Sequence, residues 1–345
     1  MNATGTWMSR EIAEAPSVVA AQENALRAPL QQLAQRLRSS PPKVVVTCAR
    51  GSSAHAAAFA KHLIERYLAI PVAPAAPSIA SVYHRSLDLR GQLVLSISQS
   101  GRSDDLIAFT QAARRSGALT VAVTNDAGSP LAAACDVVLP IGAGPERSVA
   151  ATKTFVATAA ALLRLTAAWA GDAALDAALR RLPHRLADAS ALDWGEGAAL
   201  LSTAASTVAI GRGPTLAIAR EAALKLKEVC NLHAEAFSGA EFLHGPVALV
   251  TPSYPAMMFL PADEAAPGMR TLAAELAQKG MALVVAGGSC PGLGLPTLPA
   301  LPAEQPEADA ICSIQSFYVM AVAIADRLGI DVDQPRHLRK VTRTT

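Results

Sequence analysis

The sequence has few aromatic residues and no strong excess of charge of either sign. Aromatics make up 4% of the 345 residues, so stacking platforms for nucleic-acid bases are not expected. The formal net charge is only +2, and no basic run is interleaved with aromatics, which argues against a nucleic-acid partner. The five cysteines lie far apart, with no C-x-x-C pair. This spacing predicts a reducing compartment, with neither a disulfide framework nor a metal site.

The chain also lacks a secretory signal and a clear membrane-spanning run. Glu11 and Glu14 interrupt the N-terminus. The most apolar span, residues 155–170, is rich in alanine and carries Arg164, which favours a packed helix over a membrane crossing. We therefore expect a cytoplasmic protein with no membrane partner. Its length and its 51% hydrophobic residues predict two domains with large cores.

Strand patterns alternate with segments of helical length. An N-terminal helical segment covers residues 8–37, and a second helix is expected over residues 54–67. Strands are expected in the first half at residues 44–47, 93–97, 119–123 and 137–140. Strands separated in this way indicate βαβ units, so the fold class is α/β, with parallel sheets covered by helices.

The second half of the chain repeats this plan. Gly213 lies 162 residues after Gly51, and Gly280 lies 163 residues after Gly117, within matching strand and helix patterns. The near-constant offset predicts duplication of one α/β domain. The alternative is a coincidence between two generic α/β patterns.

A Ser/Gly loop at residues 98–103 follows the expected strand at residues 93–97 and precedes a helical pattern. Hydroxyls, free backbone N–H groups and the helix N-terminus would converge there, an arrangement that suits a phosphate monoester. The alternative is a serine cap without a ligand. In the second copy, Asp263 and Glu264 occupy the corresponding loop and would repel a phosphate. Only the first copy is therefore expected to bind phosphate.

Three further features carry groups that could do chemistry. Glu221, Lys225 and Glu228 share one helix face, either as a carboxylate base beside an ammonium or as ordinary exposed ion pairs. His244 precedes Gly-Pro, so we expect a turn to present it, and a histidine can shuttle a proton near neutral pH. Lys340 lies in a basic tail, either as a solvated charge or as an amine able to meet a carbonyl.

Together these segments resemble the sugar-isomerase (SIS) tandem domain of glucosamine-6-phosphate synthase. The matching motifs lie at residues 51–53, 98–101, 149–153, 221–228, 233–235, 244–246 and 331–340. The resemblance implies two SIS domains, each a flavodoxin-like doubly wound parallel sheet sandwiched by helices. The expected divisions are a helical segment at 1–36, SIS domains at 37–175 and 197–335, and a tail at 336–345 that closes the site.

The resemblance also gives the matched residues roles. Glu228 would move a proton between C1 and C2, Lys225 would stabilise the developing charge, His244 would open the sugar ring, and Lys340 would meet the ketose carbonyl. The expected substrate contacts are a backbone contact from Val149 and a phosphate site formed by Ser52, Ser53, Ser98, Gln99, Ser100 and Ser103. Arg102 and Ala151 depart from the synthase pattern, and Arg102 predicts a more cationic phosphate loop.

No glutaminase half is recognisable, because no N-terminal cysteine opens the chain and residues 1–42 are too few to form that domain. A chain ending in Leu-x-Lys-Val-Thr is most similar to SIS-type glucosamine-6-phosphate deaminases, which implies conversion of glucosamine 6-phosphate and water to fructose 6-phosphate and ammonia. The alternatives are a fructosamine-6-phosphate deglycase, an aldose–ketose phosphosugar isomerase and a non-catalytic phosphosugar sensor. The resemblance implies no cofactor, and a homodimer whose subunits share each site.

Overall fold

The computed structural model describes residues 5–340 and divides into two compact units. Of the described residues, the first unit comprises 5–16, 147–152 and 181–338, and the second comprises 17–146, 153–180 and 339–340. Two long helices contribute residues to both units: α1 (Trp7–Ser39) and α7 (Ala173–Ser190).

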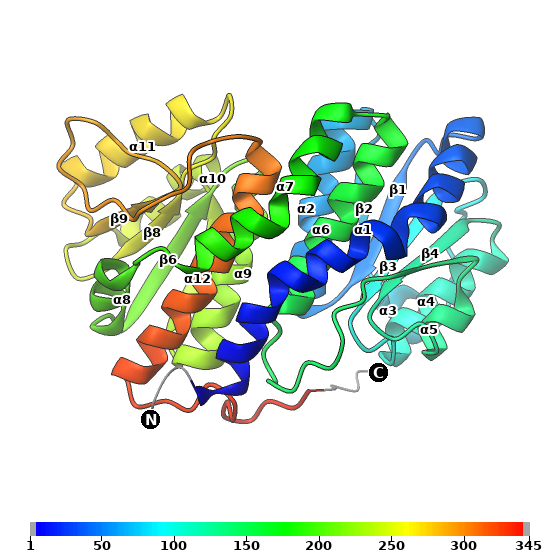
Figure 1. Cartoon of the computed structure of the whole chain (residues 1–345), viewed down its shortest axis with the longest axis horizontal. Coiled ribbons are helices and arrows are strands. Elements are labelled where there is room, and N and C mark those ends of the chain that lie inside the picture. Colours follow the sequence, from blue (N-terminus) through cyan, green and yellow to red (C-terminus); the bar gives the residue numbers. More distant parts are fainter. Residues whose placement is uncertain (1–4, 341–345) are drawn as a thin grey trace. The chain divides into compact units, whose positions relative to one another are not determined.

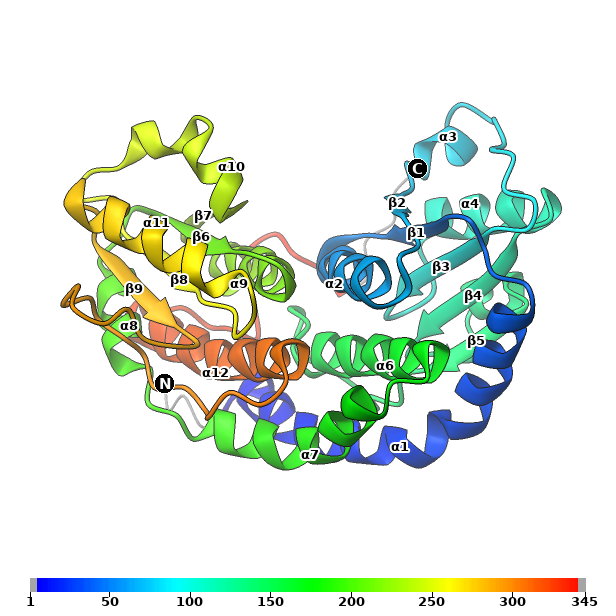
Figure 2. The same ribbon diagram turned by 90° about the horizontal axis from the view of Figure 1, so that it is seen from above.

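The second unit is built on a five-stranded parallel sheet with the strand order β2-β1-β3-β4-β5 (Figure 1; β5 is labelled in Figure 2). Its strands are β1 (Val45–Ala49), β2 (Val72–Pro74), β3 (Leu93–Ser98), β4 (Leu119–Thr124) and β5 (Val137–Pro140). Its other helices are α2 (Gly51–Leu68), α3 (Ser78–Ser81), α4 (Asp104–Arg115), α5 (Pro130–Ala134) and α6 (Lys153–Ala170). This is the doubly wound order, in which the chain reverses its direction of winding between β1 and β3.

Helices cover both faces of this sheet because right-handed crossovers that run in opposite directions place them on opposite sides. Figure 2 shows α2 and α6 on one side and α4 on the other. On the α4 side, Leu106 and Phe109 pack against Val46, Cys48 and Val94. The inner strands β1, β3 and β4 are buried on both faces, which explains why they are mainly apolar runs.

The first unit has a four-stranded parallel sheet with the order β7-β6-β8-β9 (Figure 2). Its strands are β6 (Ser206–Gly211), β7 (His233–Ser238), β8 (Ala256–Phe259) and β9 (Leu283–Ala286). Its helices are α8 (Gly195–Ser202), α9 (Pro214–Cys230), α10 (Gly239–Leu243), α11 (Ala266–Gln278), α12 (Pro306–Arg327) and a short 3₁₀ helix, η2 (Pro246–Leu249). Met269, Leu272 and Leu276 of α11 pack on Met258 and Val285 of the sheet.

The two sheets confirm the expected fold class and the internal repeat. β6, α9, β8 and β9 follow one another as β1, α2, β3 and β4 do, and the strand orders match up to the additional β5. The four strands predicted in the first half all form, within one or two residues of their expected ends.

The compact units do not follow the order of the sequence. The residues of α1 up to Pro16 belong to one unit, and those from Ser17 belong to the other. Residues 147–152 interrupt the second unit's sequence and belong to the first. Which residues form a compact unit is therefore set by packing in space and not by their order in the sequence.

One helix among the described residues, α12, is long and apolar enough to meet the length and composition criteria for a membrane span. Within the fold, 78% of its most apolar window is buried. It contacts α9 and α8, so it has the surroundings of a core helix in a globular domain.

Candidate active site

The Ser/Gly loop lies where a doubly wound sheet favours a ligand. β1 and β3 are neighbouring parallel strands with Ala49 opposite Ile97, so the loops that follow them leave the same edge of the sheet. Ligands of such sheets bind outside the carboxyl ends of the strands, at the point where the strand order reverses. Ser52 and Ser53 in the first turn of α2 and the loop at residues 98–103 occupy this switch point.

An ion pair joins the two loops. Arg50, directly before α2, donates to Asp105 Oδ2 from Nε at 3.0 Å and from an Nη at 2.7 Å. Asp105 stands in the first turn of α4 and is buried, so the pair ties the starts of α2 and α4 together. The first N–H groups of both helices lack intrahelical partners, and both N-termini carry partial positive charge. The structure thus brings together two groups of serines that are about 50 residues apart in sequence.

Hydrogen bonds within the loop fix its shape. Ser98 Oγ accepts from the N–H of Gly101 at 3.2 Å, and Ser100 Oγ accepts from the N–H of Arg102 at 3.3 Å. Ser103 is the N-cap of α4, but its side chain makes no capping hydrogen bond. The alternative that these serines only cap the helix therefore does not hold for Ser103, because its hydroxyl caps no N–H group of α4.

The structure revises the expectation for Arg102 and supports the expected difference between the two copies at this loop. Arg102 does not make the loop simply more cationic, because its guanidinium pairs with Asp126 at 2.9 Å. In the second sheet, Asp263 and Glu264 follow β8, where the first has its serines. Asp263 Oδ1 accepts the N–H of Ala265 at 2.9 Å, so this carboxylate shapes the turn before α11. The two copies differ at the predicted position.

The three charged residues of α9 are not an exposed face. Glu221 and Lys225 are fully buried, and the Glu228 side chain keeps 22% of its exposure. Lys225 Nζ lies 3.5 Å from Glu221 Oε1 and pairs closely with Glu228 Oε2. Tyr318 of α12 donates its hydroxyl to Glu221 Oε1 at 3.2 Å. A buried ammonium is therefore held between two carboxylates, of which only Glu228 reaches solvent.

His244 is presented from a turn, as the sequence predicts. It ends the short helix α10, its N–H bonds to the carbonyl of Glu241 at 3.0 Å, and its side chain is exposed. Ser238 begins α10 by accepting the N–H of Glu241 on its Oγ at 3.1 Å. The Gly-Pro that follows starts η2, which ends the helix and leaves the imidazole in the open.

Glu11 fixes the loop that carries Val149. This carboxylate of α1 is buried, and it accepts the N–H groups of Arg147 and Ser148 and the Ser148 hydroxyl. Val149 follows directly and is partly exposed. The sequence offered no signal for this contact, since Glu11 and Ser148 are 137 residues apart.

Lys340 does not point into solvent as an isolated tail charge. Its Nζ donates to Glu146 Oε2 at 3.1 Å, and the Glu146 side chain is fully buried. Gln99, a predicted phosphate contact, also donates to Glu146 Oε2, at 2.6 Å. Glu146 was not among the predicted site residues, because a lone carboxylate in a Gly/Pro-rich stretch has no spacing that relates it to a lysine 194 residues later. The remaining tail residues, 341–345, lie outside the described part of the chain.

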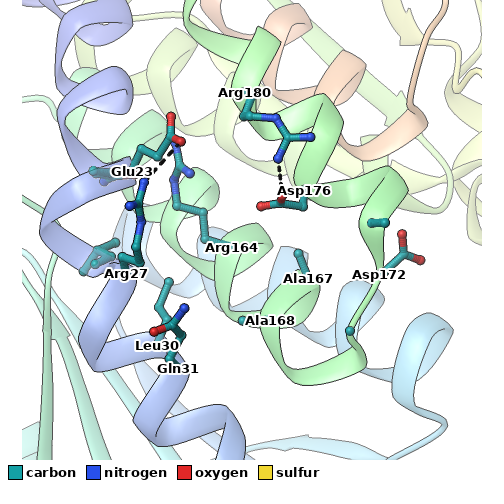
Figure 3. A pocket seen from close by; sticks show the side chains of 14 residues that line it. Glu23, Arg27, Leu30, Gln31, Arg164, Ala167, Ala168, Asp172, Asp176 and Arg180 are labelled. Atoms are coloured by element: carbon teal, nitrogen blue, oxygen red, sulfur yellow. Dashed lines mark hydrogen bonds and ion pairs between the residues drawn. The ribbon is translucent and has the colours of Figure 1, made fainter.

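A cavity of about 470 Å³ in the second unit contains none of the predicted site residues (Figure 3). It is lined by α1, α6 and the start of α7, and Arg164 lies at its side, 7% exposed. Burial lowers the pKa of Arg164, while the charges of Glu23 and Asp176 oppose this effect. The rim charges pair off as Glu23 with Arg27 and Asp176 with Arg180. Because the positive and negative side chains around the cavity are paired, the cavity selects neither an anionic nor a cationic ligand.

The described residues hold no cluster of three or more His, Cys, Asp or Glu side chains that could bind a metal ion. All five cysteines are buried and unpaired. Burial raises the thiol pKa of Cys135, Cys230 and Cys312 to about 12 in each case. These thiols are inert core residues rather than nucleophiles.

Comparison with known proteins places this geometry in context. The SIS domain family model matches residues 40–168 and 200–286. A glutamine–fructose-6-phosphate aminotransferase (isomerizing) from Caulobacter vibrioides is 34% identical over 313 residues, covering 86% of this chain and 51% of that protein. The chain thus spans about half the length of the curated relatives it matches.

Two solved structures share the fold over nearly the whole chain. A Silicibacter pomeroyi DSS-3 protein, described as a candidate phosphosugar isomerase, is 43% identical with a TM-score of 0.91, covering 95% of this chain and 100% of that one. The C-terminal domain of glucosamine-fructose-6-phosphate aminotransferase from Francisella tularensis is 25% identical with a TM-score of 0.84, covering 96% and 98%.

Proposed function

The chain belongs to the SIS domain family, and on that premise we propose that it is a phosphosugar enzyme, specifically a glucosamine-6-phosphate deaminase. The observation that carries the proposal is the buried Lys225 on α9, paired with a Glu228 that still reaches solvent. A carboxylate held beside an ammonium can take a proton from carbon while the ammonium stabilises the negative charge that develops. Burial of these charges costs desolvation free energy that their pairing offsets only in part, which favours a functional role for the cluster over a purely stabilising one.

The proposed reaction assigns each group one step. The serines at the β1–β3 switch point and the N-termini of α2 and α4 hold the 6-phosphate. His244 opens the sugar ring, and Glu228 takes the proton from C2 and returns it at C1. One proton passes from the C2 amine to the C1 oxygen, so the amine becomes an imine and the aldehyde becomes a hydroxyl. Water then adds to the imine carbon and releases ammonia, which leaves fructose 6-phosphate. Lys340 would contact the C2 carbonyl of the ketose, fructose 6-phosphate.

An aldose–ketose phosphosugar isomerase is the second candidate. Glu228 would then move the same proton on a sugar with a hydroxyl at C2, and no ammonia would be released. The similarity to the S. pomeroyi protein, 43% identical and described as a candidate phosphosugar isomerase, supports this alternative. The homodimer with shared sites and the cytoplasmic location are proposals of the same family resemblance.

The test compares Glu228→Gln with wild type on glucosamine 6-phosphate, following ammonia and fructose 6-phosphate together. The amide keeps the shape but loses basicity, so kcat should fall by at least about 10²-fold with little change in KM. Exchange of the C2 hydrogen with deuterium from solvent should stop. Glu275→Gln is the matched control, because Glu275 is an exposed carboxylate on α11.

The outcomes separate the candidates. Release of fructose 6-phosphate and ammonia in equal amounts by wild type, lost in Glu228→Gln, supports the deaminase. Turnover of a hydroxyl sugar phosphate without ammonia supports the isomerase. Near-normal C2 exchange in Glu228→Gln would remove Glu228 from the chemistry and favour a non-catalytic phosphosugar sensor.

A further inference from the structure

Glu146 stands in the loop between β5 and α6, and it collects hydrogen bonds from three different parts of the second unit. Its Oε2 accepts from Gln99 Nε2 at 2.6 Å, from Thr154 Oγ1 at 2.9 Å and from Lys340 Nζ at 3.1 Å. Its Oε1 accepts the N–H of Thr154 at 3.2 Å. The side chain is fully buried, so these donors stabilise a carboxylate that water does not reach.

Three described donors share one oxygen of this carboxylate. A carboxylate offers about four lone-pair sites on its two oxygens, so Oε2 alone has roughly two. Three donors exceed these two sites, so Gln99, Thr154 and Lys340 compete for Oε2, and withdrawal of one donor leaves a lone pair to the others. Of the three, Gln99 belongs to the predicted phosphate loop and Lys340 to the tail.

We propose that Glu146 is a positioning residue that couples occupancy of the phosphate loop to the hold on Lys340. This inference rests on the proposed function of the loop. A bound phosphate accepts the amide N–H of Gln99 and draws it from Oε2. Oε2 then binds Lys340 more strongly, which fixes the tail lysine when a phosphorylated substrate is present. By linkage, a stronger Lys340–Glu146 pair favours phosphate binding to the same degree.

The experiment measures the reactivity of the Lys340 amine. Native protein is treated with a limiting amount of N-hydroxysuccinimidyl acetate at fixed pH, with and without inorganic phosphate, and acetylation is mapped by mass spectrometry. The reagent needs the nitrogen lone pair of the amine, and a hydrogen bond from Lys340 Nζ to the buried Glu146 carboxylate holds that nitrogen away from the reagent. Lys279, an exposed lysine at the end of α11, is the internal control.

Glu146→Gln and Thr154→Val should change this rate in opposite directions. The amide removes the charge, so Lys340 should be acetylated at least about threefold faster, as expected for loss of a partly exposed ion pair. The valine removes one competing donor without changing the charge, so Lys340 should react more slowly than in wild type. A general loosening of the fold would speed the acetylation of Lys340 in both variants, whereas the exposed Lys279 reports the amount of active reagent.

Phosphate supplies the decisive comparison. In wild type it should slow acetylation of Lys340, and in Glu146→Gln it should have no effect. Equal slowing in both proteins would mean that phosphate merely blocks access, and the coupling would be wrong. An unchanged rate in Glu146→Gln without phosphate would show that the ion pair does not hold the lysine, and a faster rate in Thr154→Val would refute the competition at Oε2.

None of these rates depends on turnover, so the two proposals can fail separately. If phosphate slows acetylation of Lys340 but wild type releases neither ammonia nor isomerised sugar, the role of Glu146 stands and the proposed reaction is wrong. If wild type turns over its substrate but phosphate does not change acetylation of Lys340, the reaction stands and the role of Glu146 is wrong.

Discussion

Replacing Gly101 by alanine tests the geometry of the phosphate loop most directly. Gly101 has φ +61°, in the left-handed region that side chains rarely adopt. A Cβ at this position would press against Ser129 Oγ and lie 2.5 Å from Ser129 Cβ. Ser129 is fully buried and caps α5 by accepting the N–H of Ala132 at 3.3 Å, so it cannot move without losing that cap.

The magnitude follows from two contributions. The left-handed backbone costs alanine about 1–2 kcal/mol. Displacing the Ser129 cap adds about 0.5–2 kcal/mol. Gly101→Ala should therefore lose about 1.5–4 kcal/mol of unfolding free energy. Since 1 kcal/mol shifts Tm by about 2–4 °C for a unit of 150–250 residues, the midpoint should fall by roughly 3–16 °C.

Gly142→Ala is the matched control. Gly142 has φ +65°, nearly the same backbone conformation, and its Cβ would meet nothing within 4 Å. Only the backbone contribution of about 1–2 kcal/mol remains for this variant. The difference between the two variants isolates the contact with Ser129.

A double variant completes the measurement. Ser129→Gly removes the atoms that the new Cβ would strike and, at an N-cap, costs only a few tenths of a kcal/mol. Gly101→Ala should thus be milder in the Ser129→Gly background, with thermal unfolding followed by circular dichroism. Equal losses for Gly101→Ala and Gly142→Ala, or simple additivity with Ser129→Gly, would refute the packing described for this loop.

Three further outcomes are expected. Ser100→Ala and Ser103→Ala should raise KM for a phosphosugar substrate, each removing a charge-assisted hydrogen bond of about 1.5–3 kcal/mol, and equal turnover of the unphosphorylated sugar would contradict the loop's assignment. Asp333→Ala should lower the unfolding free energy by about 1–2 kcal/mol, because this carboxylate accepts the first two N–H groups of α1 at 2.7 and 3.0 Å. Asp333→Asn should lose less when both variants are unfolded with denaturant. Cys230 and Cys312 should resist thiol reagents at pH 8 in the native protein and react after unfolding, because burial raises each pKa to about 12; rapid native labelling would contradict that burial.

The sequence determined the features that depend on neighbouring residues. Alternating strand and helix patterns specified parallel sheets, and the serine loop after the strand at residues 93–97 was recognisable because strand, turn and helix start are local signals. The near-constant offset between the two halves revealed the duplication. The turn at His244 followed from the Gly-Pro after it, since proline excludes helix continuation locally.

The tertiary structure decided what depends on distant partners. Helical spacing placed Glu221, Lys225 and Glu228 on one face but left open whether that face was exposed; packing against Tyr318, 97 residues from Glu221, buries it. Glu146 likewise has no local pattern, because its lysine partner lies 194 residues away. Periodicity in the sequence indicates which residues share a helix face. Burial and charge pairing arise only when the folded chain brings remote segments together, and burial and pairing determine which charged side chains can take part in chemistry.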